Sequence, residues 1–186
     1  VADAAEMGVS TSAEDTVDNW YWTGIGGTEL TDVSIEVPSP HPSEAGETSR
    51  ARMRVAFRGL TDVPWTSQDH EVHLLVNGNP PVPGMAPAVW DGQNEFIYET
   101  PVFPLARTLK HGTNVVTFRT PQDRGFLDRS CLNWIRIEYF RNYRALDDHF
   151  RFIPAEQDIG ALKQFTITNF STPALDLWDI ANHRVL

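Results

Sequence analysis

The chain has 186 residues, of which 41% are hydrophobic, and its formal net charge is -10. This hydrophobic content supports a packed core and excludes a disordered tail. The acidic balance argues against binding to nucleic acid and against docking on anionic lipid, because both present negative charge. No apolar run reaches the roughly 18 residues of a membrane span, so we expect no membrane insertion.

The residue types present favour a β-protein whose stability comes from its core. Six Trp and ten Phe are typical of packed strands, and thirteen Pro and twelve Gly indicate many turns. Cys131 is the single cysteine, so an intrachain disulfide is excluded. The sequence begins with Val1, and we expect a segment of a longer protein or a mature chain.

The first part of the chain predicts an arm followed by strands. Residues 1–18 are small and acidic and predict an N-terminal arm, and residues 19–150 are the expected β-sandwich domain. Residues 30–37 predict a strand. Residues 51–59 predict a stronger one, because apolar side chains alternate there with Arg52, Arg54 and Arg58.

The middle of the chain continues this pattern. Residues 70–78 predict a strand that ends in an Asn-Gly turn. Residues 96–103 predict another strand, and 105–109 one helical turn. Residues 114–119 and 132–141 complete the set, and the latter alternates sharply, with Ile135, Ile137 and Tyr139 on one face.

The last part, residues 151–186, predicts either the closing strands of the sandwich or the start of a neighbouring module. Residues 164–170 and 174–180 predict a hairpin pair. No long segment has a helical period. Roughly eight to ten short strands therefore predict an all-β fold, which we expect to be a jelly-roll or galactose-binding-like β-sandwich.

Cys131 is the candidate nucleophile, with His111 as its candidate base. A caspase-like peptidase places the two on loops after neighbouring parallel strands, joined by a helical crossover. One strand and a loop fill the interval between His111 and Cys131. We therefore expect an inert, semi-buried thiol, no catalytic residue in this chain, and a segment that is not itself an enzyme.

Metal-ligating residues lack a binding pattern. His70 and His73 would point to opposite faces of a strand, so they cannot share one metal ion. Loop carboxylates could hold Ca²⁺, namely those of Asp123, Asp128, Asp147 and Asp148. No Asp-x-Asp-x-Asp-Gly loop is present, so we interpret them as solvated surface charge and expect no cofactor and no metal site.

Two tryptophans sit beside Gly, Pro and Asp, as in sugar-binding loops. Aromatic rings stack on sugar faces while neighbouring polar groups read the hydroxyls. This makes Trp65, Trp90 and Asp91 the candidate ligand-binding residues. The alternative is that both rings cap the ends of the sandwich core.

Four segments together resemble a known family. They are His70-x-x-His73-Leu74-Leu75-Val76-Asn77-Gly78, Val89-Trp90-Asp91-Gly92, Leu109-x-x-Gly112-x-Asn114 and the stretch from Leu132 to Tyr143. Residues 50–180 resemble the non-catalytic β-sandwich ahead of the peptidase domain in gingipain-type cysteine peptidases, including the related cell-surface sortase-like proteins of Bacteroidetes. Residues 165–183 are similar to the segment that leads towards that peptidase domain.

The resemblance implies an accessory domain of a secreted or cell-surface bacterial protein. Its partner would be the peptidase domain of the same polypeptide, and another protein or a glycan could also bind. This hypothesis expects Trp65 and Trp90 mostly buried. The alternative, a carbohydrate-binding module, expects one of them exposed with Asp, Asn or Arg in reach.

Overall fold

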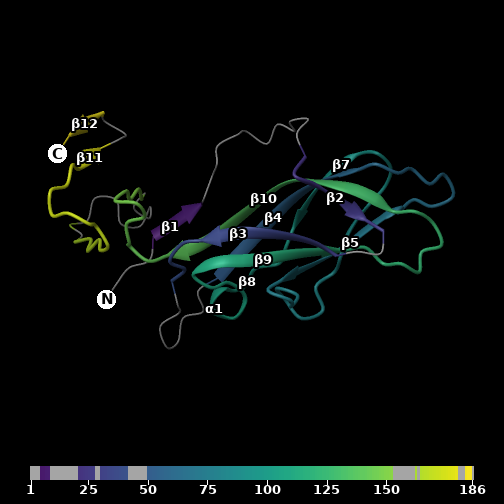
Figure 1. The fold of residues 1–186 in the computed structure, drawn as a ribbon, viewed down its shortest axis with the longest axis horizontal. Coiled ribbons are helices and arrows are strands. Elements are labelled where there is room, and N and C mark those ends of the chain that lie inside the picture. Colours follow the sequence, from purple (N-terminus) through teal and green to yellow (C-terminus); the bar gives the residue numbers. More distant parts are fainter. Residues whose placement is uncertain are drawn as a thin grey trace.

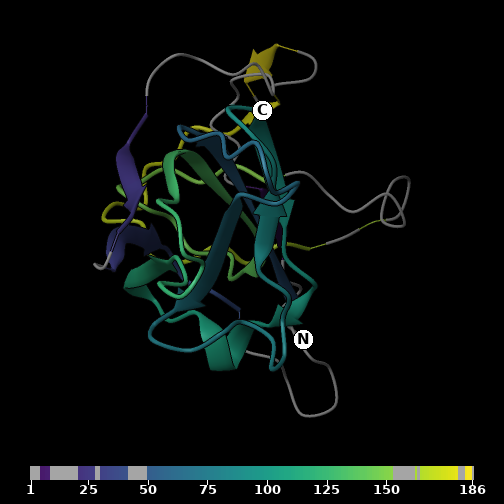
Figure 2. The same ribbon diagram turned by 90° about the vertical axis from the view of Figure 1, so that its right-hand side faces the viewer.

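The computed structural model describes residues 5–8, 21–27, 30–41, 50–152, 162, 164–179 and 183–185. Within these residues the fold is nearly all β, with two antiparallel sheets that pack face to face (Figures 1 and 2). The predicted all-β sandwich is confirmed. No helix among the described residues is long and apolar enough to cross a membrane.

The first sheet is built around two long central strands. Its order is β1–β10–β4–β7, with β2 also paired to β10 and β8 to β4. The bounds are β1 Ala5–Gly8, β2 Thr23–Gly26, β4 Arg50–Gly59, β7 Glu95–Glu99, β8 Phe103–Pro104 and β10 Arg129–Arg141. In the central pair Ile137 lies opposite Met53, and the register shifts between Leu132 and Trp134.

The second sheet has the order β3–β9–β5–β6. Its strands are β3 Thr31–Val37, β9 Gly112–Arg119, β5 His70–Val76 and β6 Ala88–Trp90. His73 of β5 lies opposite Arg119, the last residue of β9. The short β6 pairs only with residues 70–72 of β5.

The core lies between the two sheets and follows the predicted alternation. Met53, Val55 and Phe57 of β4 are buried, while Arg52, Arg54 and Arg58 point to the outer face. The outer arginines form ion pairs with glutamates of the neighbouring strands, such as Arg52 with Glu138 at 2.6 Å. Burial of one face explains why these strands alternate so clearly.

The turn chemistry also agrees with the sequence. Asn77 and Gly78 have φ values of 51° and 83°, so both occupy the left-handed region that a tight hairpin turn requires. The predicted helical turn is α1, Leu105–Thr108. The predicted strand 96–103 is interrupted, since Thr100 uses its hydroxyl to accept from the N–H of Met53 and Pro101 has no N–H to continue the ladder.

The C-terminal part differs from the prediction. The expected hairpin of residues 164–170 with 174–180 is wrong, because β11 (Trp178–Asp179) pairs with β12 (Arg184–Val185) instead. These two strands lie beside the C-terminus and away from the two sheets (Figure 1). Thr168 bridges to Arg144. Ile180 and most of the predicted arm, residues 1–18, lie outside the described residues.

A second, smaller aromatic cluster joins the end of β10 to the C-terminal part. It contains Tyr143, Phe150, Phe152 and Phe165, with ring centroids between 4.8 and 5.7 Å apart. The N–H of Ala145 donates to the carbonyl of Thr168, and the N–H of Thr168 donates to the carbonyl of Tyr143, which holds the two segments together. Residues 164–168 therefore fold back on residues 143–150 and add no strand to either sheet.

Candidate functional site

The three sequence-predicted ligand-binding residues differ in their exposure. Trp90 lies in β6 and is 6% exposed, so its assignment as an exposed loop aromatic is wrong. Trp65 lies in the loop after β4 and is 77% exposed, which contradicts the expectation that both rings are mostly buried. Asp91 is exposed, and its carbonyl accepts from Asn94. One ring is in the core and the other in solvent.

Trp90 is buried because three rings stack on it. The ring of His70 lies 4.6 Å from it at an interplanar angle of 22°, and Phe57 and Phe96 stack at 5.4 and 5.3 Å. The pairing of β5 with β6 sets His70 directly opposite Trp90. The Trp-Asp-Gly sequence therefore ends a core strand rather than forming a sugar-binding loop.

His70 is itself fully buried and surrounded by acceptors. Its Nδ1 lies 2.7 Å from Oδ1 of Asp128, and its Nε2 lies 3.2 and 3.1 Å from the carbonyls of Thr61 and Gly92. Carbonyl and carboxylate oxygens only accept, so both ring nitrogens are placed to donate, and this arrangement favours the imidazolium form of His70. Burial lowers the pKa of His70, but the hydrogen bond and charge of Asp128, then the charge of Asp69, raise it above its ordinary value.

Two buried carboxylates extend this network into the loops. Asp128 also accepts from the N–H of Glu71 at 2.9 Å and from Arg124 at 3.3 Å. Asp69 accepts from the N–H groups of Val63 and Gly92 at 3.0 and 2.8 Å. The network thus ties together the loops 60–69, 91–94 and 121–128 at one end of the sandwich.

The side chains of this network bond to one another and to backbone groups of the loops. His70 is fully buried, so no substrate reaches it. The oxygens of Asp128, one of the carboxylates considered for calcium, are taken by protein donors. Among the residues that the structure describes, no group of three or more His, Cys, Asp or Glu side chains is placed to hold a metal ion. As predicted, the two histidines point to opposite faces of β5: His70 is buried, whereas the His73 side chain is 33% exposed.

Cys131 and His111 lie near opposite ends of β4. Cys131 pairs with Arg58, near the Gly59 end of β4, whereas His111 follows α1, beside the Arg50 end. Nδ1 of His111 accepts from the N–H of Ser39. Cys131 is partly exposed, and burial raises the pKa of its thiol, which disfavours the reactive thiolate.

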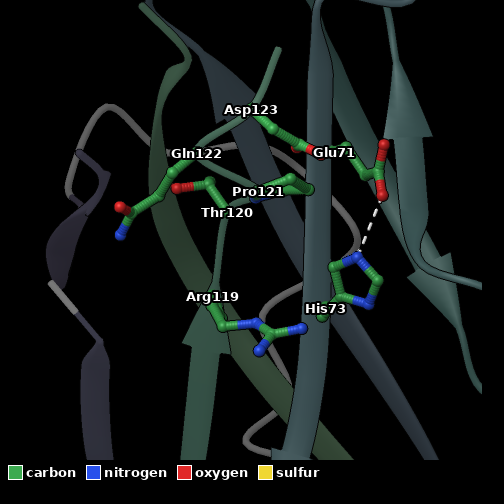
Figure 3. Close-up of a pocket in the computed structure, with 7 residues that line it drawn as sticks. All are labelled: Glu71, His73, Arg119, Thr120, Pro121, Gln122 and Asp123. Atoms are coloured by element: carbon green, nitrogen blue, oxygen red, sulfur yellow. Dashed lines mark hydrogen bonds and ion pairs between the residues drawn. The ribbon is translucent and has the colours of Figure 1, made fainter. Parts of the chain in front are cut away.

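A cleft of about 480 Å³ opens on the outer face of the second sheet (Figure 3). It forms where β9 ends at Arg119 and residues 120–123 turn away from β5. Nε2 of His73 lies 2.9 Å from Oε1 of Glu71. In Figure 3 the guanidinium of Arg119 points towards His73, and the carboxylate of Asp123 points towards Glu71.

A second hollow of about 230 Å³ continues from the cleft and shares His73 and Arg119 with it. It lies between β5 and the loop 80–87, where β6 no longer covers the edge of β5. Its wall is apolar and includes Leu75, Met85 and Pro87. We call the two hollows together the β5 groove.

The β5 groove is lined by charged, polar and apolar side chains. The hydroxyl of Thr120 donates to the carbonyl of Gly27, and no cysteine or serine lines either hollow. The guanidinium of Arg119 forms no ion pair with any part of the chain that the structure describes. Sequence reasoning missed this groove, although the alternating Glu71, His73 and Leu75 were its available signal.

Apolar side chains are exposed along the C-terminal segment. All of residues 171–178 are exposed, and Leu175, Leu177 and Trp178 have exposed fractions of 53%, 56% and 63%. We call these three residues the C-terminal apolar row. Nothing in the described part of the chain covers it, in contrast to the packed core of the sandwich.

Comparison with known proteins gives distant structural likeness and no sequence match. No protein-family model and no curated protein sequence matches the chain. Among solved structures, the chain is similar to dimeric latent PorU from Porphyromonas gingivalis, with 11% sequence identity and a TM-score of 0.43. The similarity covers 67% of this chain and spans 11% of the PorU chain.

Proposed function

We propose that this chain is a non-catalytic accessory β-sandwich of a larger secreted or cell-surface cysteine peptidase, and that it works by contact with another protein domain. The observation that carries the proposal is the C-terminal apolar row, Leu175, Leu177 and Trp178, exposed beside a fully packed core. The two sheets need no further partner for their inner faces, whereas this row has none in the described residues.

The strands β11 and β12 pair only with each other among the described residues. A two-stranded unit is at best marginally stable in water without a surface to pack on. Burying each large apolar side chain of the row would contribute about 1.5–3 kcal/mol. A tryptophan flanked by leucines is also typical of the few residues that dominate a protein interface. The row therefore has the composition of an interface that is uncovered in this chain alone.

The proposed partner is the peptidase domain of the same polypeptide. This choice rests on the sequence resemblance of residues 50–180, whose last part is similar to a segment that leads towards such a domain. The absence of a paired nucleophile supports a non-catalytic role: Cys131 has no histidine beside it among the described residues, and His70 is buried.

The carbohydrate-binding alternative is weaker. It needed Trp65 or Trp90 as an exposed platform, and Trp90 is enclosed by His70, Phe57 and Phe96. Trp65 remains exposed, but Trp90 is buried and does not join it on the surface. A single exposed ring does not favour sugar binding over protein contact.

Calorimetric titration of the chain with the separately expressed peptidase domain tests the proposal. We expect saturable binding that Leu177→Asp or Trp178→Asp weakens at least about tenfold, since each places a charge in an apolar contact. Val102→Asp is the matched control, because Val102 is 52% exposed on the sandwich itself. No binding, an equal loss with the control, or hydrolysis of peptides by this chain alone would contradict the proposal.

A further inference from the structure

The β5 groove presents three chemically different positions in a row. Glu71, His73 and Leu75 alternate along β5 and share its outer face, with a strand spacing of about 7 Å between neighbours. Asp123 lies near Glu71, and Arg119 lies near His73. Met85 and Pro87 line the same hollow as Leu75. The groove therefore passes from acidic to basic to apolar.

The two ends of β5 explain why this face is open. Residues 120–123 leave the sheet after Arg119, so the Glu71 end has no strand of β9 beside it. At the other end β6 stops pairing after Val72, and the loop 80–87 stands off β5 to form the apolar hollow. The two hollows, which share His73 and Arg119, thus follow each other along the face of β5, with the loop 80–87 on one side and residues 120–123 on the other.

The walls of this groove are held by partly buried and exposed hydrogen bonds. Arg124, which follows the 120–123 turn, binds Asp128 and the carbonyl of Gln68. The N–H of Glu71 donates to Asp128 in the same network. On the other wall the hydroxyl of Tyr98 donates to the carbonyl of Ala86. A binding surface with such fixed walls loses little entropy when it takes up a ligand.

We propose that the β5 groove binds an extended peptide segment. This segment has a basic, an acidic and an apolar residue in that order, with one spacer residue between each pair. Side chains two positions apart in an extended peptide lie on one face at the same spacing of about 7 Å. The basic side chain meets Glu71 and Asp123, the acidic one meets Arg119, and the apolar one enters the hollow at Leu75 and Met85.

Charge complementarity selects this occupant over others. A purely anionic ligand would face Glu71 and Asp123, and a purely cationic ligand would face Arg119. A peptide with both charges in the stated order places its basic group near Glu71 and Asp123. It also gives Arg119 the carboxylate that the described residues do not supply. The inference concerns a different surface from the C-terminal apolar row and goes beyond the proposed function.

Fluorescence anisotropy with labelled, end-blocked peptides tests the inference. The probes are Gly-Lys-Ser-Glu-Ser-Leu-Gly and its reverse sequence, since an extended peptide can run in either direction along β5. We expect saturable binding of at least one probe. Exchanging Lys and Glu within that probe should weaken its binding about fivefold, because each charged side chain of the peptide then faces a protein group of the same charge.

A charge exchange between protein and peptide gives the sharpest readout. Arg119→Glu should lower the affinity for the probe about tenfold. Replacing the Glu of the probe by Lys should restore binding to this variant. Arg107→Glu is the matched control, because Arg107 is exposed on α1 and its replacement changes the net charge equally. Binding to this control should stay within about twofold of the wild type.

Three outcomes would overturn the inference. They are no saturable binding of either probe, equal affinity for the exchanged-order peptide, and equal losses with Arg107→Glu and Arg119→Glu, which would indicate bulk attraction only. Failure here is distinguishable from failure of the proposed function. Arg119→Glu leaves the C-terminal apolar row intact, and Trp178→Asp leaves the groove intact.

Discussion

The ring of Trp90 lies parallel to the ring of His70, with their centroids 4.6 Å apart, and both side chains are buried. An imidazolium above an indole face is a cation–π contact, which is strongest when water is excluded. The contact links the hydrophobic core, through Phe57 and Phe96, to the polar network of Asp69 and Asp128. Core packing and loop positions are therefore coupled at one end of the sandwich.

The two candidate tryptophans should differ sharply in their effect on stability. Trp90→Ala removes a ring enclosed by three others and should lower the free energy of unfolding by about 3–5 kcal/mol. Trp65→Ala removes a ring that is 77% exposed and should change it by less than about 0.5 kcal/mol. Urea unfolding of both variants measures this, and equal losses would contradict the structure.

Stability should fall as the pH rises through the pKa of His70. The folded pKa of His70 is raised above its ordinary value of 6.5, so its contribution is fully present below that value. The contribution is lost as the pH rises from 6.5 through the folded pKa. Urea unfolding of the wild type across this window should show a declining free energy.

Asp128→Asn supplies the comparison for this pH effect. It removes the charge that most strongly raises the pKa of His70, so the decline with pH should become shallower than in the wild type. The variant should also be about 3–5 kcal/mol less stable at low pH, since it leaves a buried cation without its closest partner. Parallel pH profiles for the two proteins would refute the assignment of His70 as an imidazolium.

Gly59 should not tolerate a side chain. A Cβ at this position would lie 2.1 Å from the carbonyl oxygen of Gly92 and 2.4 Å from Nε2 of His70. Gly59→Ala should therefore displace the network and lower the free energy of unfolding by about 3 kcal/mol. Gly24→Ala is the control, since nothing lies within 4 Å of its Cβ position. Thermal unfolding distinguishes the two, and similar melting temperatures would count against the network.

Asn77 combines a backbone and a side-chain role. Its Nδ2 donates to the carbonyl of Thr108 and to Oδ1 of Asn114, and its Oδ1 accepts from Val115, in a turn where its φ is 51°. Asn77→Gly keeps the turn conformation but loses these bonds, and should cost about 1–3 kcal/mol. Asn77→Ala should cost about 1 kcal/mol more, because alanine resists this φ. A fully stable glycine variant would show that the side-chain bonds contribute nothing.

Much of the fold could be predicted from local pattern. The alternation of apolar and charged residues in 51–59 and 132–141, and the Asn77-Gly78 turn, correspond to β4, β10 and a tight turn. These features depend on neighbouring residues, so the sequence contains them directly. The hairpin expected from 164–170 and 174–180 failed, because its pairing depends on contacts such as Thr168 with Arg144, which local pattern does not encode.

The sites could not be predicted from local pattern, because they depend on contacts between distant parts of the chain. His70 and Asp128 are 58 positions apart and meet only through the packing of the loops on β5. The same holds for Trp90, whose Asp-Gly neighbours suggested an exposed loop although its pairing with His70 buries it. Arg119 and Glu71 line the same cleft because β9 ends at Arg119 and leaves the Glu71 end of β5 without a neighbouring strand on that side. Spacing alone therefore misplaced Trp90 and missed the β5 groove.

Hydrogen-exchange mass spectrometry tests the central claim most directly. The chain is measured alone and with the peptidase domain that we propose as its partner. The account predicts fast exchange of residues 171–179 in the free chain and strong protection of this segment in the mixture, with the sandwich core protected in both. Unchanged exchange of residues 171–179 at saturating peptidase domain would contradict the proposed accessory role.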